Sequence, residues 1–159
     1  MATGEIDTVT WLAEIERIKQ LKARYFRCLD TKDWEGWLGV FTDDATLTFD
    51  LAVSTLGRNG RPAPTLVGKA AIAAMVPHDL ATAQTVHHGY VPEIEILGAS
   101  EARAIWPMED IVDHGDRIFR GYGHYHETYR KTAEGWRISS VRLTRLRISA
   151  EFRDAITLG

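Results

Sequence analysis

The clearest pattern of hydrophobic and polar positions lies between residues 85 and 112, on both sides of a short segment at 98–100. Apolar residues alternate with polar ones there, which is typical of two β-strands joined by a tight loop. Pairing Glu95 with Arg103 brings opposite charges together and aligns the apolar positions of the two strands. The stretch therefore predicts an antiparallel hairpin closed by a three-residue loop.

The N-terminal part of the chain follows a helical repeat. Apolar residues recur at intervals of three and four positions from residue 8 to residue 29, so we expect a long amphipathic helix there. Asp30 or Asp33 can cap a second, shorter helix that buries two tryptophans and a leucine. A third helix is expected over residues 68–76, ended by Pro77.

Further strands are predicted at residues 45–51, 117–131 and 136–149, where polar and apolar or aromatic residues alternate. Together with the hairpin, the last two form an antiparallel meander. The segment 52–68 holds three glycines and two prolines, so it cannot form a regular element. We expect it to be a loop that lies beside a cavity or simply on the surface.

One carboxylate of the hairpin stands out because Asp110 falls in an otherwise apolar row, where it needs a partner. In strict register His88 would lie opposite it. However, Pro92 and Pro107 fall almost opposite each other and predict a bulge that shifts the pairing by one residue. His87 would then lie beside Asp110 on the inner face, either as a structural hydrogen bond or as part of a catalytic pair.

Other polar residues are candidates for a site or an interface. Tyr25 lies on the apolar stripe of the first helix, and Asp30 ends that helix, where an acid meets an unfavourable dipole. Arg145 lies among apolar neighbours and needs an acidic partner or ligand, unless it faces outward. His124 and His126 share one face of a strand. Because the sequence shows no evident third metal ligand, we expect this pair at an oligomer interface rather than in a metal site.

Composition narrows the class of protein. The 159 residues fit one domain over 1–159, and a net charge of −3 without a basic surface argues against a nucleic-acid partner. Cys28 is the single cysteine, so no internal disulfide is possible. No apolar run reaches the length of a membrane span or forms a signal peptide, so we expect no membrane partner and a cytoplasmic location.

Several segments resemble the SnoaL-like family of the nuclear transport factor 2-like superfamily: IKQLKARYFRCLDTKDW, HHGYVPEIEI, IWPMED, ETYRK and EGWRI. The resemblance extends from about residue 15 to residue 148. It is strongest to bile acid 7α-dehydratases and weaker to scytalone dehydratases and lindane dehydrochlorinases. It implies an α+β fold in which a cone-shaped, curved antiparallel sheet wraps on N-terminal helices and leaves an interior pocket, as in the cystatin-like α+β barrel.

The resemblance also implies roles for individual residues. The family's pocket tyrosine falls on Tyr25, its helix-end aspartate on Asp30, its catalytic histidine on His87, the acid that orients this histidine on Asp110, and a pocket arginine on Arg145. Substrate contacts are expected from Arg145, His88, Trp106 and Tyr125.

Such a set would support a dehydratase-type lyase that acts on a hydrophobic, polycyclic or steroid-like carbonyl compound by general acid-base chemistry. No metal or organic cofactor is expected, and the resemblance implies a homo-oligomer, either a dimer or a trimer. Two alternatives stay open: a double-bond isomerase with the same base, and a non-catalytic ligand-binding or assembly protein on the same fold.

Overall fold

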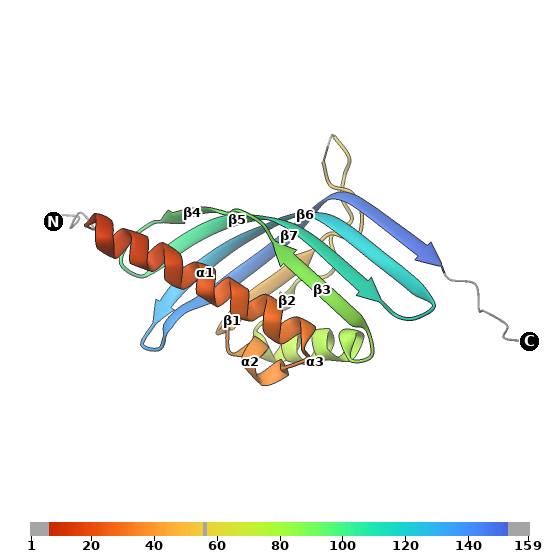
Figure 1. The fold of residues 1–159 in the computed structure, drawn as a ribbon, viewed down its shortest axis with the longest axis horizontal. Helices are drawn as coiled ribbons and strands as arrows, with labels where there is room; N and C mark the ends of the chain where they lie inside the picture. Colours follow the sequence, from red (N-terminus) through yellow and green to blue (C-terminus); the bar gives the residue numbers. More distant parts are fainter. Residues whose placement is uncertain (1–6, 56, 153–159) are drawn as a thin grey trace, which may run out of the picture.

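The computed structural model describes residues 7–55 and 57–152, which form three helices and one sheet of seven strands (Figure 1). The helices are α1 (Thr8–Asp30), α2 (Trp34–Leu38) and α3 (Lys69–Leu80), and the strands are β1 (Phe41–Phe49), β2 (Leu66–Val67), β3 (Gln84–Gly89), β4 (Glu93–Ile96), β5 (Glu101–Asp113), β6 (Arg117–Thr132) and β7 (Gly135–Phe152).

Aspartate caps start both N-terminal helices. The Asp7 carboxylate accepts hydrogen bonds of 3.1 Å from two N–H groups in the first turn of α1, and Asp33 accepts one of 2.9 Å from the N–H of Gly36 in α2. Since Asp33 caps α2, the carboxylate of Asp30 is free for other contacts.

The long helix α1 packs on the inner face of the sheet, as the apolar stripe predicts (Figure 1). Its buried apolar residues are Ile18, Leu21, Tyr25, Cys28 and Leu29. Two charged residues that the helical pattern places among the polar positions, Glu14 and Lys22, are also buried. The stripe is therefore wider than the apolar residues alone indicate, and the two charges must be paired inside the protein.

The strand order is β2-β1-β7-β6-β5-β3, with β4 paired to β5 beside β3. The predicted antiparallel meander is confirmed for β4 to β7. However, β1 runs parallel to β7, so the sheet is mixed, and it is curved but unclosed. The helix α3 continues through Pro77 to Leu80, so the prediction that Pro77 ends it is wrong; α3 packs against β1 and β2, and such contacts can hold a helix together across an interior proline.

The register of the central strands contains the predicted shift. In β4 the expected pairing with β5 is observed, with Glu95 opposite Arg103. In β3 the pairing has moved by one residue, so His87 lies opposite Asp110. The change occurs in the irregular segment 90–92 between the two strands. The predicted one-residue shift is confirmed, and His87, not its neighbour, faces inward.

The segment 52–68 is mostly irregular where it is described, and the two-residue strand β2 lies near its end. It is attached to β7, because the backbone N–H of Ser54 donates to the carbonyl of Arg145 at 2.9 Å, and the Ser54 hydroxyl accepts from the N–H of Arg145 at 2.9 Å. Among its described residues, none lines the cavity described below. Within the described chain, none of the helices combines the length and apolar character needed to span a membrane.

Candidate active site

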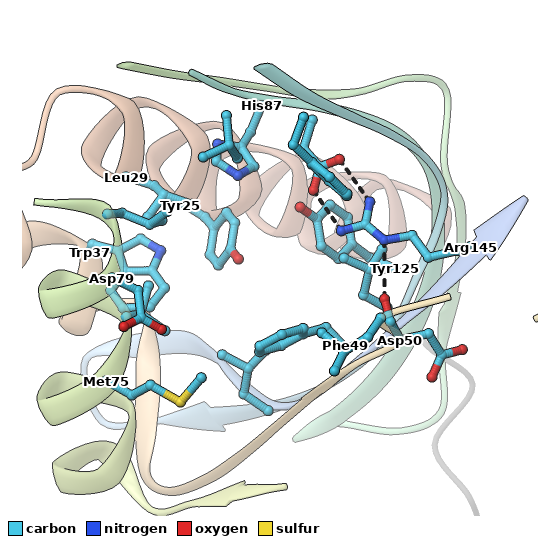
Figure 2. Close-up of a pocket in the computed structure, with 18 residues that line it drawn as sticks. Tyr25, Leu29, Trp37, Phe49, Asp50, Met75, Asp79, His87, Tyr125 and Arg145 are labelled. Carbon is cyan, nitrogen blue, oxygen red and sulfur yellow. Dashed lines mark hydrogen bonds and ion pairs between the residues drawn. The ribbon is translucent and has the colours of Figure 1, made fainter. Parts of the chain in front are cut away.

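A cavity of about 280 Å³ lies between α1, α3 and the inner face of the sheet (Figure 2). Much of its wall is apolar, from Leu29, Leu47, Phe49, Met75, Val112 and Phe119. Figure 2 shows the imidazole of His87, the hydroxyl of Tyr25 and the indole nitrogen of Trp37 directed toward this space. An apolar pocket with a few convergent polar groups is the usual form of a small-molecule site.

His87 is held by Asp30, the last residue of α1. The Nδ1–H of the imidazole donates to Asp30 Oδ1 at 2.7 Å, and the backbone N–H of the same residue donates to Asp30 Oδ2 at 2.8 Å. Because a carboxylate can only accept, Nδ1 carries a proton, and in the neutral imidazole the lone pair is therefore on Nε2. His87 is 8% exposed, so this lone pair lies in a largely dry site.

The Asp30 carboxylate is supported by β3 in turn. The Thr85 hydroxyl donates to Asp30 Oδ1 at 2.9 Å and accepts from Lys32 Nζ at 2.8 Å. Burial raises the pKa of Asp30, but the hydrogen bonds from His87 and Thr85 outweigh burial and lower this pKa below its ordinary value. Asp30 is therefore a carboxylate at neutral pH.

Asp110 has a different partner from the one expected. Its two oxygens accept a bidentate pair of hydrogen bonds from the Arg145 guanidinium, at 2.7 and 2.8 Å, and both residues are 5% exposed. The prediction that Asp110 orients His87 is thus wrong, although the two residues are paired across the strands. The fork of an arginine matches both carboxylate oxygens at once, which a single imidazole N–H cannot do.

Gly121 explains how this ion pair fits inside the sheet. A Cβ atom at position 121 would lie 2.1 Å from Arg145 Nη1 and 2.2 Å from Asp110 Oδ1, so any larger residue would displace the ends of these two side chains. Gly123 has a separate role, since a Cβ there would lie 1.8 Å from the Thr144 carbonyl oxygen, close to a shift in the register of β6 and β7.

Tyr25 and Tyr125 meet at the wall of the cavity, with ring centroids 6.2 Å apart in an edge contact. Burial, followed by the charges of Glu127 and Asp110, raises the pKa of the Tyr25 hydroxyl far above its ordinary value, while a hydrogen bond from Tyr125 lowers it only slightly. Tyr25 therefore stays protonated and can donate a hydrogen bond to a ligand.

A buried ion pair supports the two tyrosines. Lys22 Nζ donates to Glu127, both side chains have no exposed surface, and Glu127 also accepts from the Tyr129 hydroxyl. The same ammonium lies 3.9 Å from the ring centroid of Tyr25 and 3.8 Å from that of Tyr125, within the range of cation–π attraction. Sequence reading missed Lys22 because its position looks like an ordinary polar helix residue.

The structure brings together six of the eight residues singled out for the site. Tyr25, His87, Asp110, Tyr125 and Arg145 line the cavity, and Asp30 lies directly behind His87. His88 is exposed on the opposite face of β3, because neighbouring strand residues point to opposite sides. Trp106 is buried outside the cavity lining, where its indole N–H donates to Tyr129 at 2.9 Å.

Three more residues belong to the site or its support and were not singled out. Asp79 of α3 lines the cavity with a half-exposed carboxylate. Lys32 has a left-handed backbone (φ 60°), which a non-glycine residue adopts at some cost, and this turn carries its ammonium to Thr85. Trp37 was expected only as a buried residue. The sequence does predict the short helix between Asp33 and Gly39 that carries Trp37. A helical pattern, however, does not specify in which direction the indole N–H points.

Metal binding finds no support in the described residues, where no group of three or more His, Cys, Asp or Glu side chains is placed to hold an ion. His124 and His126 point to the outer face of the sheet, with ring centroids 6.2 Å apart, and His126 Nε2 lies 3.1 Å from the Thr144 hydroxyl. Their role in an oligomer interface stays a prediction.

The lowered pKa of Asp30 predicts a pH-dependent contribution to stability. Because the folded pKa is below the unfolded one, this contribution is complete above the unfolded value of about 3.9 and is lost as pH falls through the folded pKa. Asp30→Asn should therefore lower the unfolding temperature at about pH 7 and have a much smaller effect once the pH is below the folded pKa of Asp30, well under about pH 4. Calorimetry at both pH values measures this.

Asp43 provides the matched control. Its side chain is 97% exposed, and its one ion pair within the described chain is with Lys69. Asp43→Asn should change the unfolding temperature little at either pH. If Asp30→Asn lowers the unfolding temperature equally at both pH values, the carboxylate charge of Asp30 is not what stabilises its contacts with His87 and Thr85.

Comparison with known proteins supports the same fold. The chain is similar to a candidate scytalone dehydratase from Novosphingobium aromaticivorans (TM-score 0.76, 19% identity, 94% of this chain and 95% of the other). It is also similar to the hexachlorocyclohexane dehydrochlorinase LinA-type3 from Novosphingobium barchaimii (TM-score 0.71, 15% identity, 91% and 94%). At these identities the likeness concerns the fold alone.

A sequence relative and a family profile also match this chain. The chain is 26% identical to the probable cyclase FGR4 of Gibberella zeae over 133 residues. This alignment covers 81% of this chain and 89% of the relative. The profile of the SnoaL-like domain matches residues 11–142, a segment that contains Tyr25, Asp30, His87 and Asp110. The chain therefore belongs to the SnoaL-like domain family of the nuclear transport factor 2-like superfamily.

Proposed function

We propose that this protein is a dehydratase-type lyase that acts on a hydrophobic carbonyl compound, with His87 as the general base. The observation that carries the proposal is the hydrogen bond from His87 Nδ1 to Asp30, which leaves Nε2 free beside an apolar cavity. The dehydratase and dehydrochlorinase among the structural neighbours support an elimination reaction.

In the proposed reaction, His87 Nε2 removes a proton from the carbon next to the carbonyl group. The electrons of the broken C–H bond form an enolate, whose oxygen accepts a hydrogen bond from Tyr25. The enolate then re-forms the carbonyl, the C–O bond of a β-hydroxyl group breaks, and this hydroxyl takes the proton from the imidazolium. Water leaves, the base is regenerated, and Asp30 stabilises the imidazolium in between.

Asp110 and Arg145 are proposed as a wall of the site and not as proton carriers. Each neutralises the other through two hydrogen bonds, so neither presents a free charge to the ligand. Their mutual pairing keeps the cavity polar on one side and close to neutral. Tyr125 would support Tyr25 in donating to the enolate oxygen.

Mass spectrometry on a panel of one- and two-ring β-hydroxy ketones tests this function. A dehydratase yields a product lighter by one water, whereas a double-bond isomerase changes no mass and a carrier gives no product. In D₂O, the wild type should also speed the exchange of hydrogens next to the carbonyl of 1-tetralone, and His87→Ala should not. Exchange that is equally fast in this variant would contradict the proposed base.

A cyclase is the second candidate, because the sequence relative in Gibberella zeae bears that name. The same base would form the same enolate, which would attack a second carbonyl of the substrate and close a ring. Such a product keeps the substrate mass and gains a carbon–carbon bond, which carbon NMR detects.

A further inference from the structure

The indole N–H of Trp37 has no hydrogen-bond partner, although the residue has no exposed surface. The other two buried tryptophans differ in this respect. Trp106 donates to the Tyr129 hydroxyl at 2.9 Å, and Trp136 donates to the Glu14 carboxylate. Since buried donors in folded proteins are nearly always paired, the free N–H of Trp37 requires an explanation.

Packing fixes the ring of Trp37 and leaves its N–H facing the cavity. The indole contacts Phe41 (ring centroids 5.0 Å apart), Tyr25 (5.8 Å) and Trp34 (6.2 Å), so it cannot turn without disturbing the core. Trp37 lines the cavity, and Figure 2 shows its nitrogen on the cavity side of the ring, toward the Tyr25 hydroxyl. A ligand is the partner that this position can receive.

The charges around the cavity favour a neutral ligand. Arg145 is already neutralised by Asp110 through two hydrogen bonds. The carboxylate of Asp79 also lines the cavity and would repel an anion. A ligand oxygen at Trp37 is therefore a neutral acceptor, such as a carbonyl, in preference to a carboxylate.

Volume restricts the size of that ligand. A cavity of about 280 Å³ lies just below the range of about 300–1,000 Å³ found for drug-sized ligands. It suits a compound of one or two rings better than the steroid-like skeleton that the sequence resemblance implies.

We infer that Trp37 is a substrate-binding residue whose Nε1–H donates to the carbonyl oxygen of a compact, neutral one- or two-ring ketone, beside the hydroxyl of Tyr25. The inference rests on the proposed function for the identity of the reacting carbonyl group. It adds a second donor at the oxygen that becomes negative in the enolate, and it makes Trp37 a determinant of specificity for ketones.

NMR of the intact wild-type protein, labelled with ¹⁵N, tests the inference directly. Titration with 1-tetralone should move the indole N–H signal of Trp37 downfield, as expected for a newly formed hydrogen bond. The hydrocarbon tetralin, which has the same rings without the oxygen, should not produce this shift. The signals of Trp106 and Trp136 serve as internal controls because both N–H groups already have partners.

Trp37→Phe gives an independent test, because it removes the N–H and retains an aromatic ring. A neutral hydrogen bond contributes about 0.5–1.5 kcal/mol, so the variant should bind 1-tetralone about 2- to 13-fold more weakly, with a smaller change for tetralin. Equal weakening for both compounds would show a packing defect instead and overturn the inference. Wild-type protein that does not bind 1-tetralone, or binds it without moving the Trp37 signal, would also overturn it.

The two proposals fail in different ways. Binding of 1-tetralone at Trp37 needs no turnover, so the shift should persist in His87→Ala. A persistent shift without any elimination or hydrogen exchange would leave Trp37 as a ketone-binding residue and end the dehydratase proposal. Normal elimination without the Trp37 shift would end only the present inference.

Discussion

Replacing His87 with alanine should lower kcat by about 10²- to 10⁴-fold on any substrate from which the wild type removes water. The variant loses the only cavity-lining imidazole in the described chain, and Asp30 behind it would be left without the group that it orients. Steady-state kinetics measure the loss. KM should change much less than kcat, because the imidazole acts on the proton in transfer and not on ligand packing.

His88 is the matched control, since it is the next residue along β3 and lies exposed on the other face. His88→Ala should keep kcat close to that of the wild type. The thermal unfolding of both variants should be compared, so that loss of activity can be separated from loss of fold. Near-normal turnover in His87→Ala would exclude this histidine as the base.

Replacing Lys22 with methionine should lower the free energy of unfolding by about 3–5 kcal/mol. The change removes one partner of a fully buried ion pair and leaves Glu127 as an uncompensated charge beneath Tyr25 and Tyr125. Methionine retains most of the volume of the lysine side chain, so the effect reports on charge more than on packing. Urea unfolding followed by tryptophan fluorescence gives the difference.

A surface ion pair provides the comparison. Arg103 and Glu95 lie on paired strands with side chains 63% and 55% exposed, so Arg103→Met should cost about 0–1 kcal/mol. The double variant Lys22→Met with Glu127→Met should regain part of the lost stability, because no buried charge remains. A Lys22→Met cost no larger than that of Arg103→Met would mean that Glu127 finds another partner or takes up a proton.

Local sequence signals were sufficient for much of the fold. Alternation and helical spacing predicted α1, the central hairpin and the meander, and two prolines predicted the one-residue shift that turns His87 inward. These features depend on neighbours in sequence or on directly paired strands, where the pattern of side chains determines the register and the buried face. The parallel pairing of β1 with β7 joins distant segments and left no comparable signal.

The partners inside the site could not be predicted in the same way. Both Asp30 and Asp110 were correctly expected near the site, but which acid holds His87 depends on where β7 places Arg145, and Arg145 captures Asp110. The free N–H of Trp37 likewise depends on how one ring is packed in three dimensions. Sequence patterns identify the faces of elements and do not specify side-chain rotamers.

The position of β7 between β1 and β6 affects how the chain reaches its native state. The two acids of the site are paired across long separations, 57 residues for Asp30 with His87 and 35 for Asp110 with Arg145, and Lys22 and Glu127 are 105 residues apart. Contacts between distant segments slow folding, because each closes a large loop before it gains energy. Until β7 docks, β1 and β6 have no common neighbour in the sheet, so we expect the cavity to form late in folding.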